Sequence, residues 1–249
     1  MMKKTLLSCL GLVCLFQTTS FAQTHLIDLN IQGGVSLEQF SEVTKGLGGI
    51  GFGGSALFNI EDSPFYLGGS LGYMIYGKTS FGSQEAFVDG YWYDADIVFN
   101  NNIVHGHAVS RIRPKDLADR FITPYFDLMF GFKSIYTKQK VFVPDLQDDE
   151  EFDFWDDLLF PVAYETEIVL SSWTLSYGGA VGVNFNFGGE SGEEIALDLK
   201  VVYLEGTRAE YVTHDDIEYD SFNDQYLYNT RSSRTSMFMP QIGITYILY

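Results

Sequence analysis

The sequence lacks several features on which common protein classes depend. Its two cysteines, Cys9 and Cys14, lie near the start, so the rest of the chain can form no disulfide, thiol nucleophile or cysteine metal site. Beyond Phe16, no apolar run approaches the ~20 residues that a membrane-spanning helix requires. Basic residues are scarce, with 15 Lys and Arg against 33 Asp and Glu, which argues against nucleic acid or an anionic membrane surface as a partner.

The first 22 residues predict a secretory signal peptide. Two lysines precede an apolar run from Leu6 to Phe16, and small residues follow at Ser20 and Ala22. A transmembrane helix is the alternative, but the run is too short for one. We expect cleavage after Ala22 and a mature domain of residues 23–249. Removing the two lysines leaves 13 basic residues against 33 acidic ones, a formal net charge of −20.

The clearest pattern in the sequence is an alternation from Ser172 to Phe187. Every second residue from Trp173 onwards is large and apolar or a glycine, and the residues between are small or polar. Side chains alternate across a β-strand with period two, so this is one long two-faced strand. Strands that cross an outer membrane have about 9–11 tilted residues, an apolar outer face, a polar inner face and aromatics at both interfaces. The segment predicts such a strand.

Further segments show the same alternation and bring the number of predicted strands to eight. They are 25–36, 48–60, 65–76, 103–113, 124–136, 195–211 and a last strand that ends at Tyr249. Pro240 lies inside the last strand, where the loss of a ladder hydrogen bond predicts a β-bulge.

The connections between these strands alternate in length. Short ones are predicted at 61–64, 114–122 and 188–193, and long ones at 77–102, 138–167 and 212–233; the polar connection 38–47 is brief. Outer-membrane barrels have short periplasmic turns and longer extracellular loops. The sequence therefore predicts an all-β fold: an eight-stranded antiparallel up-and-down transmembrane β-barrel with both termini in the periplasm.

The alternating strands, the asymmetry of the loops and the aromatic end at Tyr246–Tyr249 resemble the small eight-stranded outer-membrane β-barrel family, of the OmpA transmembrane domain and OmpX type. The resemblance covers the whole mature chain. It implies a location in the outer membrane of a Gram-negative bacterium, contact with outer-membrane lipid and lipopolysaccharide, and insertion by the barrel-assembly machinery. Members of the family include anchors, adhesins, resistance factors and a few enzymes, so the resemblance does not fix a role.

Ionisable residues on the inner face are predicted to meet in the periplasmic half of the lumen. They are Asp28, Arg111, Asp127, Asp198 and Lys200. An eight-stranded barrel is just wide enough for side chains to fill, and buried charges need partners. We expect a charge-paired network that plugs the lumen; a proton or ion pathway is the alternative. A soluble lipocalin-like barrel would instead put most of these charges on its outer face.

A second inward cluster is predicted near the outer rim. His105 and His107 share one face of the fourth strand, and Lys133 lies near their level on the next. Two histidines at this spacing can ligate a metal or serve in acid–base chemistry, but ordinary lumen packing is the simpler interpretation. No nucleophile or acid pair could be placed beside them, so we assign no catalytic residue, no metal and no cofactor.

The longest predicted loop is strongly acidic. Its acidic residues are Asp145, Asp148, Asp149, Glu150, Glu151, Asp153, Asp156 and Asp157. Clustered carboxylates suit Ca²⁺, although the order of residues does not match an EF-hand loop. A solvated, repulsive loop is the simpler interpretation, and its aromatics could instead contact lipopolysaccharide or a protein.

The pattern as a whole favours a non-enzymatic, monomeric outer-membrane barrel. Its acidic, tyrosine-rich loops would serve envelope integrity or bind an extracellular ligand. A narrow pore for small solutes or ions is the alternative, and an outer-membrane enzyme with a site at the outer rim is a third.

Overall fold

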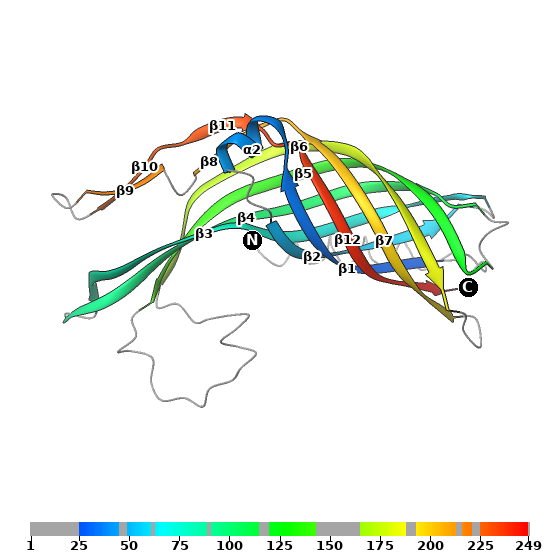
Figure 1. Ribbon diagram of the computed structural model, residues 1–249, viewed down its shortest axis with the longest axis horizontal. Helices are drawn as coiled ribbons and strands as arrows, with labels where there is room; N and C mark the ends of the chain where they lie inside the picture. The colour runs from blue at the N-terminus through cyan, green and yellow to red at the C-terminus, as the bar shows by residue number, and fades with distance from the viewer. Residues whose placement is uncertain are drawn as a thin grey trace, which may run out of the picture.

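The computed structural model describes residues 25–44, 49–60, 63–88, 91–114, 120–142, 165–187, 193–212, 216–220 and 225–248. Within them, eight antiparallel strands close into a barrel in the order β1-β12-β7-β6-β5-β4-β3-β2 (Figure 1). The barrel strands are β1 (His25–Ser36), β2 (Gly49–Asn59), β3 (Phe65–Val88), β4 (Tyr91–Ile112), β5 (Ile122–Phe142), β6 (Glu165–Asn186), β7 (Glu193–Gly206) and β12 (Met237–Leu248). The predicted fold class is confirmed.

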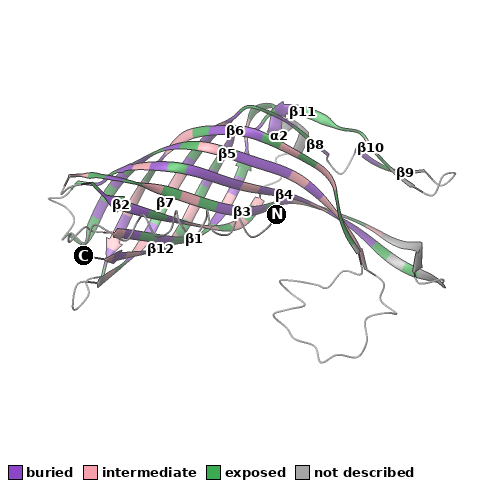
Figure 2. Ribbon diagram, turned by 180° about the vertical axis from the view of Figure 1, so that it is seen from behind, coloured by how far each residue is buried: buried purple, intermediate pink, exposed green. Residues whose placement is uncertain are grey.

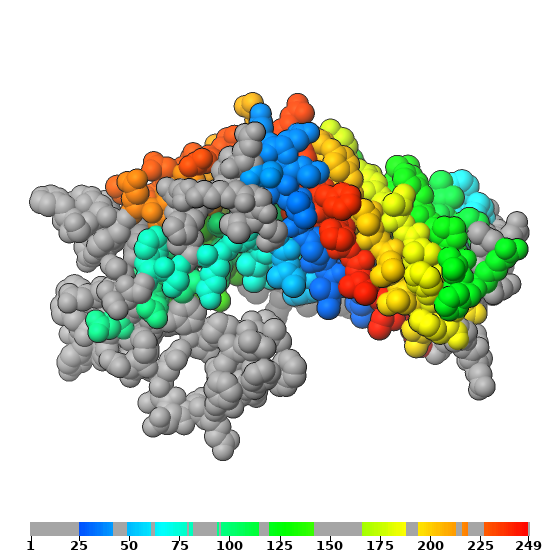
Figure 3. Space-filling model, viewed as in Figure 1, coloured from blue at the N-terminus to red at the C-terminus, as the bar shows by residue number. Residues whose placement is uncertain are grey.

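The two faces of the barrel wall have opposite polarity, as the alternation predicts. On β1, Leu29 is 68% exposed whereas the neighbouring Asp28 is 1% exposed. On β5, Phe130 is 62% exposed while Met129 is buried. Buried and exposed positions alternate along the strands in Figure 2, and Figure 3 shows β1, β12 and β7 as neighbouring oblique bands. The outer wall is therefore apolar and the lumen is filled by the inward residues.

The strands β3 to β6 extend beyond the barrel at one end, and this corrects the predicted loops. The segment 77–102 is mostly hairpin, because β3 runs to Val88 and β4 begins at Tyr91, with register shifts between Ile75 and Gly77 and between Phe81 and Gln84. Similarly, β5 and β6 remain paired to Val141 and Glu165, inside the predicted loop 138–167. These segments carry polar residues on both faces, so they pair without the alternation from which strands were predicted.

The predicted seventh strand, 195–211, was too long. β7 ends at Gly206, and β8 (Arg208–Tyr211) leaves the barrel to pair with β11 (Arg231–Arg234). The predicted loop 212–233 contains a hairpin of β9 (Ile217–Asp220) and β10 (Gln225–Tyr228). We call β8 to β11 the flap; Figure 1 shows it at the end of the barrel from which β3 and β4 project.

A short helix replaces the predicted polar connection after the first strand. α2 (Glu38–Thr44) lies near β8 and β11 in Figure 1 and buries Phe40 completely. No helix among the described residues is long and apolar enough to cross a membrane.

The bulge predicted at Pro240 is wrong. β12 pairs with β7 in unbroken register from Met237 to Leu248. On the other side the register with β1 is unchanged, but the pairing is interrupted between Gln32 and Val35. Proline lacks an N–H group, and the missing ladder bond is accommodated by this gap in one ladder rather than by an extra residue.

Candidate functional site: the barrel lumen

A buried arginine links two aspartates from different strands, in the half of the lumen where β1 begins. Arg111 on β4 donates from Nε to Asp127 Oδ1 at 2.7 Å and from Nη2 to Asp28 Oδ2 at 3.0 Å. All three side chains are at most 1% exposed. The guanidinium also lies over the ring of Tyr125, 3.9 Å from its centroid. The arrangement is held because β4, β5 and β1 each present an inward residue at this level.

Neutral side chains continue this cluster to the opposite wall. Thr245 donates to Asp28 at 2.8 Å, and Asn184 donates both to Thr245 and to Asp198, at 3.1 Å each. The Tyr125 hydroxyl donates to the same Asp198 carboxylate at 2.6 Å. Because these residues come from β1, β12, β6, β7 and β5, a continuous hydrogen-bonded layer crosses the lumen. We call it the ionic layer.

Lys200 completes the five residues predicted for this network. It is 6% exposed, and its charge attracts Asp28. Three carboxylates and two cations are thus enclosed together, and each ion pair reduces the cost of removing the others from water. The structure brings the five predicted residues together in one buried layer.

The histidine pair lies in a second polar layer, next to Lys133. His105 pairs across strands with Lys133, and the two histidine rings lie 5.4 Å apart. His105 Nε2 is 3.1 Å from Gln32 Nε2, and His107 Nε2 is 3.0 Å from Ser176 Oγ. Lys133 donates to the carbonyl oxygen of Thr235. Both histidines are 4% exposed and Lys133 is 0% exposed, so these residues are enclosed in the lumen and do not form an open rim site.

Aromatic side chains close the lumen at the end where the flap lies. Phe40 of α2 contacts Tyr211 of β8, with ring centroids 5.1 Å apart, and Tyr76 of β3, at 5.7 Å. All three are at most 4% exposed. We call them the aromatic mouth. They belong to one buried apolar cluster with Met74 and Ile103 of the barrel wall.

The chemistry available in the lumen is limited by this enclosure. His107 and Ser176 form a pair of the kind found in hydrolases, but a catalytic histidine also needs its second nitrogen oriented by another group. His107 Nδ1 meets no partner among the described residues, and Ser176 is 0% exposed. Within the part of the chain that the structure describes, no three His, Cys, Asp or Glu residues are placed to hold a metal ion.

Several predicted features fall outside the described residues. These are the signal peptide 1–22 and the acidic loop residues from Asp145 to Asp157. Their assignments remain predictions.

Some site residues were not predicted from the sequence. The alternation placed Tyr125, Asn184 and Thr245 on the inner face, but strand register across the lumen decides which carboxylate each one contacts. Phe40 offered only one signal, an aromatic residue within a polar connection.

Comparisons with known proteins gave structural likenesses alone. No protein-family model matches the chain, and no curated protein matches it. Among solved structures, the chain is similar to Ail, the attachment invasion locus protein of Yersinia pestis, in complex with the heparin analogue sucrose octasulfate. The two sequences are 13% identical, the match covers 92% of this chain and 100% of Ail, and the TM-score is 0.41. It is also similar to Neisserial surface protein A, with 9% identity, 92% and 97% covered and a TM-score of 0.35.

A third similar structure is a major outer membrane protein from Thermus thermophilus, with 10% identity, 89% and 99% covered and a TM-score of 0.36. The closed eight-stranded barrel of the present chain rests on its own strand pairing, from β1 round to β12, and not on these likenesses.

Proposed function

We propose that this chain is an integral outer-membrane barrel protein of a Gram-negative bacterium that catalyses no reaction and serves envelope integrity or binding. One observation carries the proposal: an apolar outer wall surrounds a lumen filled by the ionic layer. Large apolar side chains are exposed on the outer face of every barrel strand, which suits lipid, whereas so many of them would cost solubility in water. The buried ions suit a structural plug, because Arg111 pairs with both Asp28 and Asp127, and Asp198 accepts hydrogen bonds from Tyr125 and Asn184.

The orientation follows from the two ends of the barrel. At one end of the barrel, β1 begins beside the last residues of β12, β2 ends at Asn59 and β3 begins at Phe65. The same end carries the close of β4 and β6 and the start of β5 and β7, and the flap and the extended parts of β3 to β6 lie at the other end. Short turns belong to the periplasm and longer segments to the exterior. Both termini are therefore proposed to be periplasmic, with the acidic loop and the flap outside. The barrel-assembly machinery and outer-membrane lipid are the expected partners, and an extracellular ligand would meet the flap and loops.

A localisation experiment tests this proposal. The full chain, expressed in a Gram-negative host, should fractionate with the outer membrane and migrate differently on gels before and after heating. An epitope inserted after residue 150 should be accessible on intact cells, and the same epitope after residue 190 should be accessible only after lysis. Recovery of the chain as a soluble periplasmic protein would overturn the proposal, and the reverse pattern of accessibility would overturn the orientation.

A further inference from the structure

The seam between the first barrel strand, β1, and the last, β12, is interrupted in the half of the wall towards the flap. The two strands lie side by side in Figure 1, and they pair without a break from His25 to Gln32 of β1. Gly33 and Gly34 are then not paired with β12, because Pro240 has no N–H to donate across the seam. This gap is a weak point in an otherwise closed wall.

Little pairing closes the seam beyond the gap. In the described part of the chain, β1 and β12 pair again at two positions: Val35 with Phe238 and Ser36 with Met237. One more backbone bond follows, from the Leu37 N–H to the Ser236 carbonyl oxygen at 3.0 Å. Short, terminal stretches of a ladder open at lower free energy than its interior. The seam can therefore open beyond Pro240 while β1 stays paired with β2, and β12 with β7.

The outer surface of the wall is low at the gap. Gly33 has no side chain, and the Pro240 ring lies beside it, with its Cγ 3.5 Å from where a Cβ of Gly33 would be. On either side of Gly33 along β1, Ile31 and Val35 are 60% and 44% exposed. An apolar chain in the surrounding bilayer can therefore approach the backbone of the seam between these side chains.

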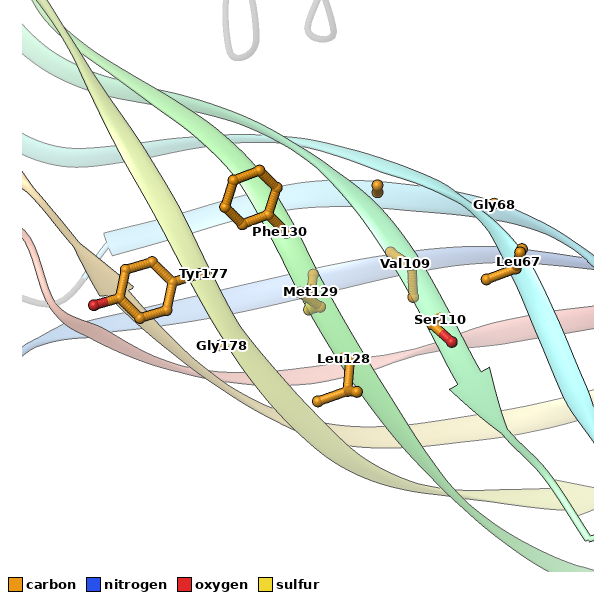
Figure 4. A pocket seen from close by; sticks show the side chains of 10 residues that line it. Leu67, Gly68, Val109, Ser110, Leu128, Met129, Phe130, Tyr177 and Gly178 are labelled. Atoms are coloured by element: carbon orange, nitrogen blue, oxygen red, sulfur yellow. The ribbon is translucent and has the colours of Figure 1, made fainter.

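The wall has another hollow, but the ladders beneath it are closed. A depression of about 630 Å³ lies over β3 to β6, where Leu67, Ser110, Phe130 and Tyr177 face outward (Figure 4). The register of β4 with both its neighbours is continuous at this level, and so is that of β5 with β6. Lipid that fills this hollow does not reach the lumen, so the hollow serves as a comparison for the seam.

Behind the seam the lumen is apolar and lined by adaptable side chains. Met74, Met237 and Met239 are at most 2% exposed and lie in one buried apolar cluster with Leu204. The Met237 Cε lies 3.1 Å from where a Cβ of Gly34 would be, so these residues directly back the gap. We call the three methionines the methionine cluster. Methionine is unbranched and rearranges readily, so the cluster can make room for an acyl chain.

A row of three polar side chains lies next to the methionine cluster. Gln241 Nε2 donates to Gln32 Oε1 at 3.1 Å, and Gln32 Nε2 lies 3.1 Å from His105 Nε2. Because the Gln32 amide nitrogen is a donor, His105 Nε2 accepts and the ring proton is assigned to Nδ1. Gln241 Oε1 and His105 Nδ1 are buried and have no hydrogen-bond partner among the described residues. The row thus offers one acceptor and one donor to a ligand with a carboxyl end group.

We propose that this part of the lumen binds a fatty acid, which enters from the bilayer through the seam at Pro240. Its acyl chain takes the place of the methionine side chains, and its carboxyl group hydrogen-bonds to the polar row. The inference rests on the proposed function, because it needs the barrel to stand in a bilayer. It leaves the lumen closed to ions, since the ionic layer around Arg111 lies beyond the polar row.

Photocrosslinking of the refolded barrel in lipid vesicles tests the inference. The probe is a fatty acid with a diazirine in its chain, and mass spectrometry locates the labelled residues. The wild type should be labelled at the methionine cluster and also at the outward hollow over β3 to β6, which reports ordinary lipid contact. In V35C/F238C a disulfide closes the seam beyond the gap, and the chain has no other cysteine after Cys14. Its oxidised form should lose only the inward labelling, and reduction should restore it.

Two further variants make the test specific to the seam. A56C/G69C is the matched control, because these outward residues pair across the unbroken ladder of β2 and β3. Its oxidised form should be labelled as the wild type is. Pro240→Val restores the missing N–H and should lower the inward labelling about fivefold, the factor that one net hydrogen bond contributes.

The outcomes separate this inference from the proposed function. Heat-modifiable migration of each variant reports whether the barrel has formed. If the methionine cluster of the folded wild type is not labelled, or is labelled equally in oxidised V35C/F238C, the inference is overturned although the barrel stands. Equal inward labelling by a diazirine alkane without a carboxyl group would overturn the fatty acid as the ligand. If the wild type forms no barrel, the proposed function itself fails.

Discussion

At the scale of single residues, Arg111 is the group whose loss the lumen should tolerate least. Its replacement by Met leaves Asp28 and Asp127 buried without their cation, and breaking a buried ion pair in this way costs about 3–5 kcal/mol. We expect a matching fall in the free energy of unfolding, measured by urea titration of the barrel in lipid vesicles. The triple variant R111M/D28N/D127N should recover most of the loss, because no uncompensated charge remains.

Arg234→Gln is the matched control for that prediction. Arg234 lies 3.8 Å from Glu205, and its side chain is 64% exposed. An exposed pair of this kind contributes at most about 1 kcal/mol. Equal destabilisation by Arg111→Met and Arg234→Gln would contradict the burial of Arg111 in the ionic layer.

Gly72 tests the packing of the histidine layer. A Cβ at this inward position would overlap the His105 ring and approach the Gln32 amide to 2.9 Å. Overpacking of this kind costs about 1–3 kcal/mol, so Gly72→Ala should lower the urea midpoint. Gly69→Ala, on the same strand but facing outward, has its nearest atom at 3.6 Å and should be close to neutral. A neutral Gly72→Ala would contradict the enclosed position of His105.

At the scale of elements, α2 and the flap depend on each other through Phe40. Phe40→Ala removes the contacts with Tyr76 and Tyr211, and a buried Phe→Ala change typically costs about 3–5 kcal/mol. The barrel pairing does not involve Phe40, so the loss should appear as faster proteolysis and amide exchange of the flap while heat-modifiable migration persists. Gln39→Ala, at an exposed position of the same helix, should change neither. Global unfolding by Phe40→Ala would contradict this prediction, because it would mean that the pairing of the barrel strands depends on the aromatic mouth.

The same elements explain which parts of the fold the sequence could predict. A strand of the barrel wall has an apolar outer face and a polar inner face, so apolar and polar residues alternate along it. This alternation made the barrel part of each strand recognisable, as in Trp173–Phe187 for β6. Asn100–Asn102 put asparagine on both faces of β4, so its outer half carried no such signal. Tertiary pairing, not local pattern, extends these strands.

The lumen was predictable in part for a related reason. Parity alone placed Arg111 and Asp127 on the inner face, and their neighbouring strands brought them together. The contact between Tyr125 and Asp198 joins strands that are not adjacent, so it depends on barrel closure and shear, which no local pattern encodes.

At the scale of the whole molecule, two closed layers lie in series along the lumen. An ion crossing the barrel would have to pass the aromatic mouth, where Phe40, Tyr76 and Tyr211 are buried together, and then the ionic layer around Arg111. Eight strands leave an interior that side chains fill, whereas barrels of 16–18 strands leave an aqueous channel. The wild-type protein in a planar bilayer should therefore give no stable conductance step, beside a large porin recorded in the same way as the positive control. Phe40→Ala alone should stay closed, because the ionic layer remains. Uniform, long-lived steps from the wild type would overturn the sealed lumen and favour the pore.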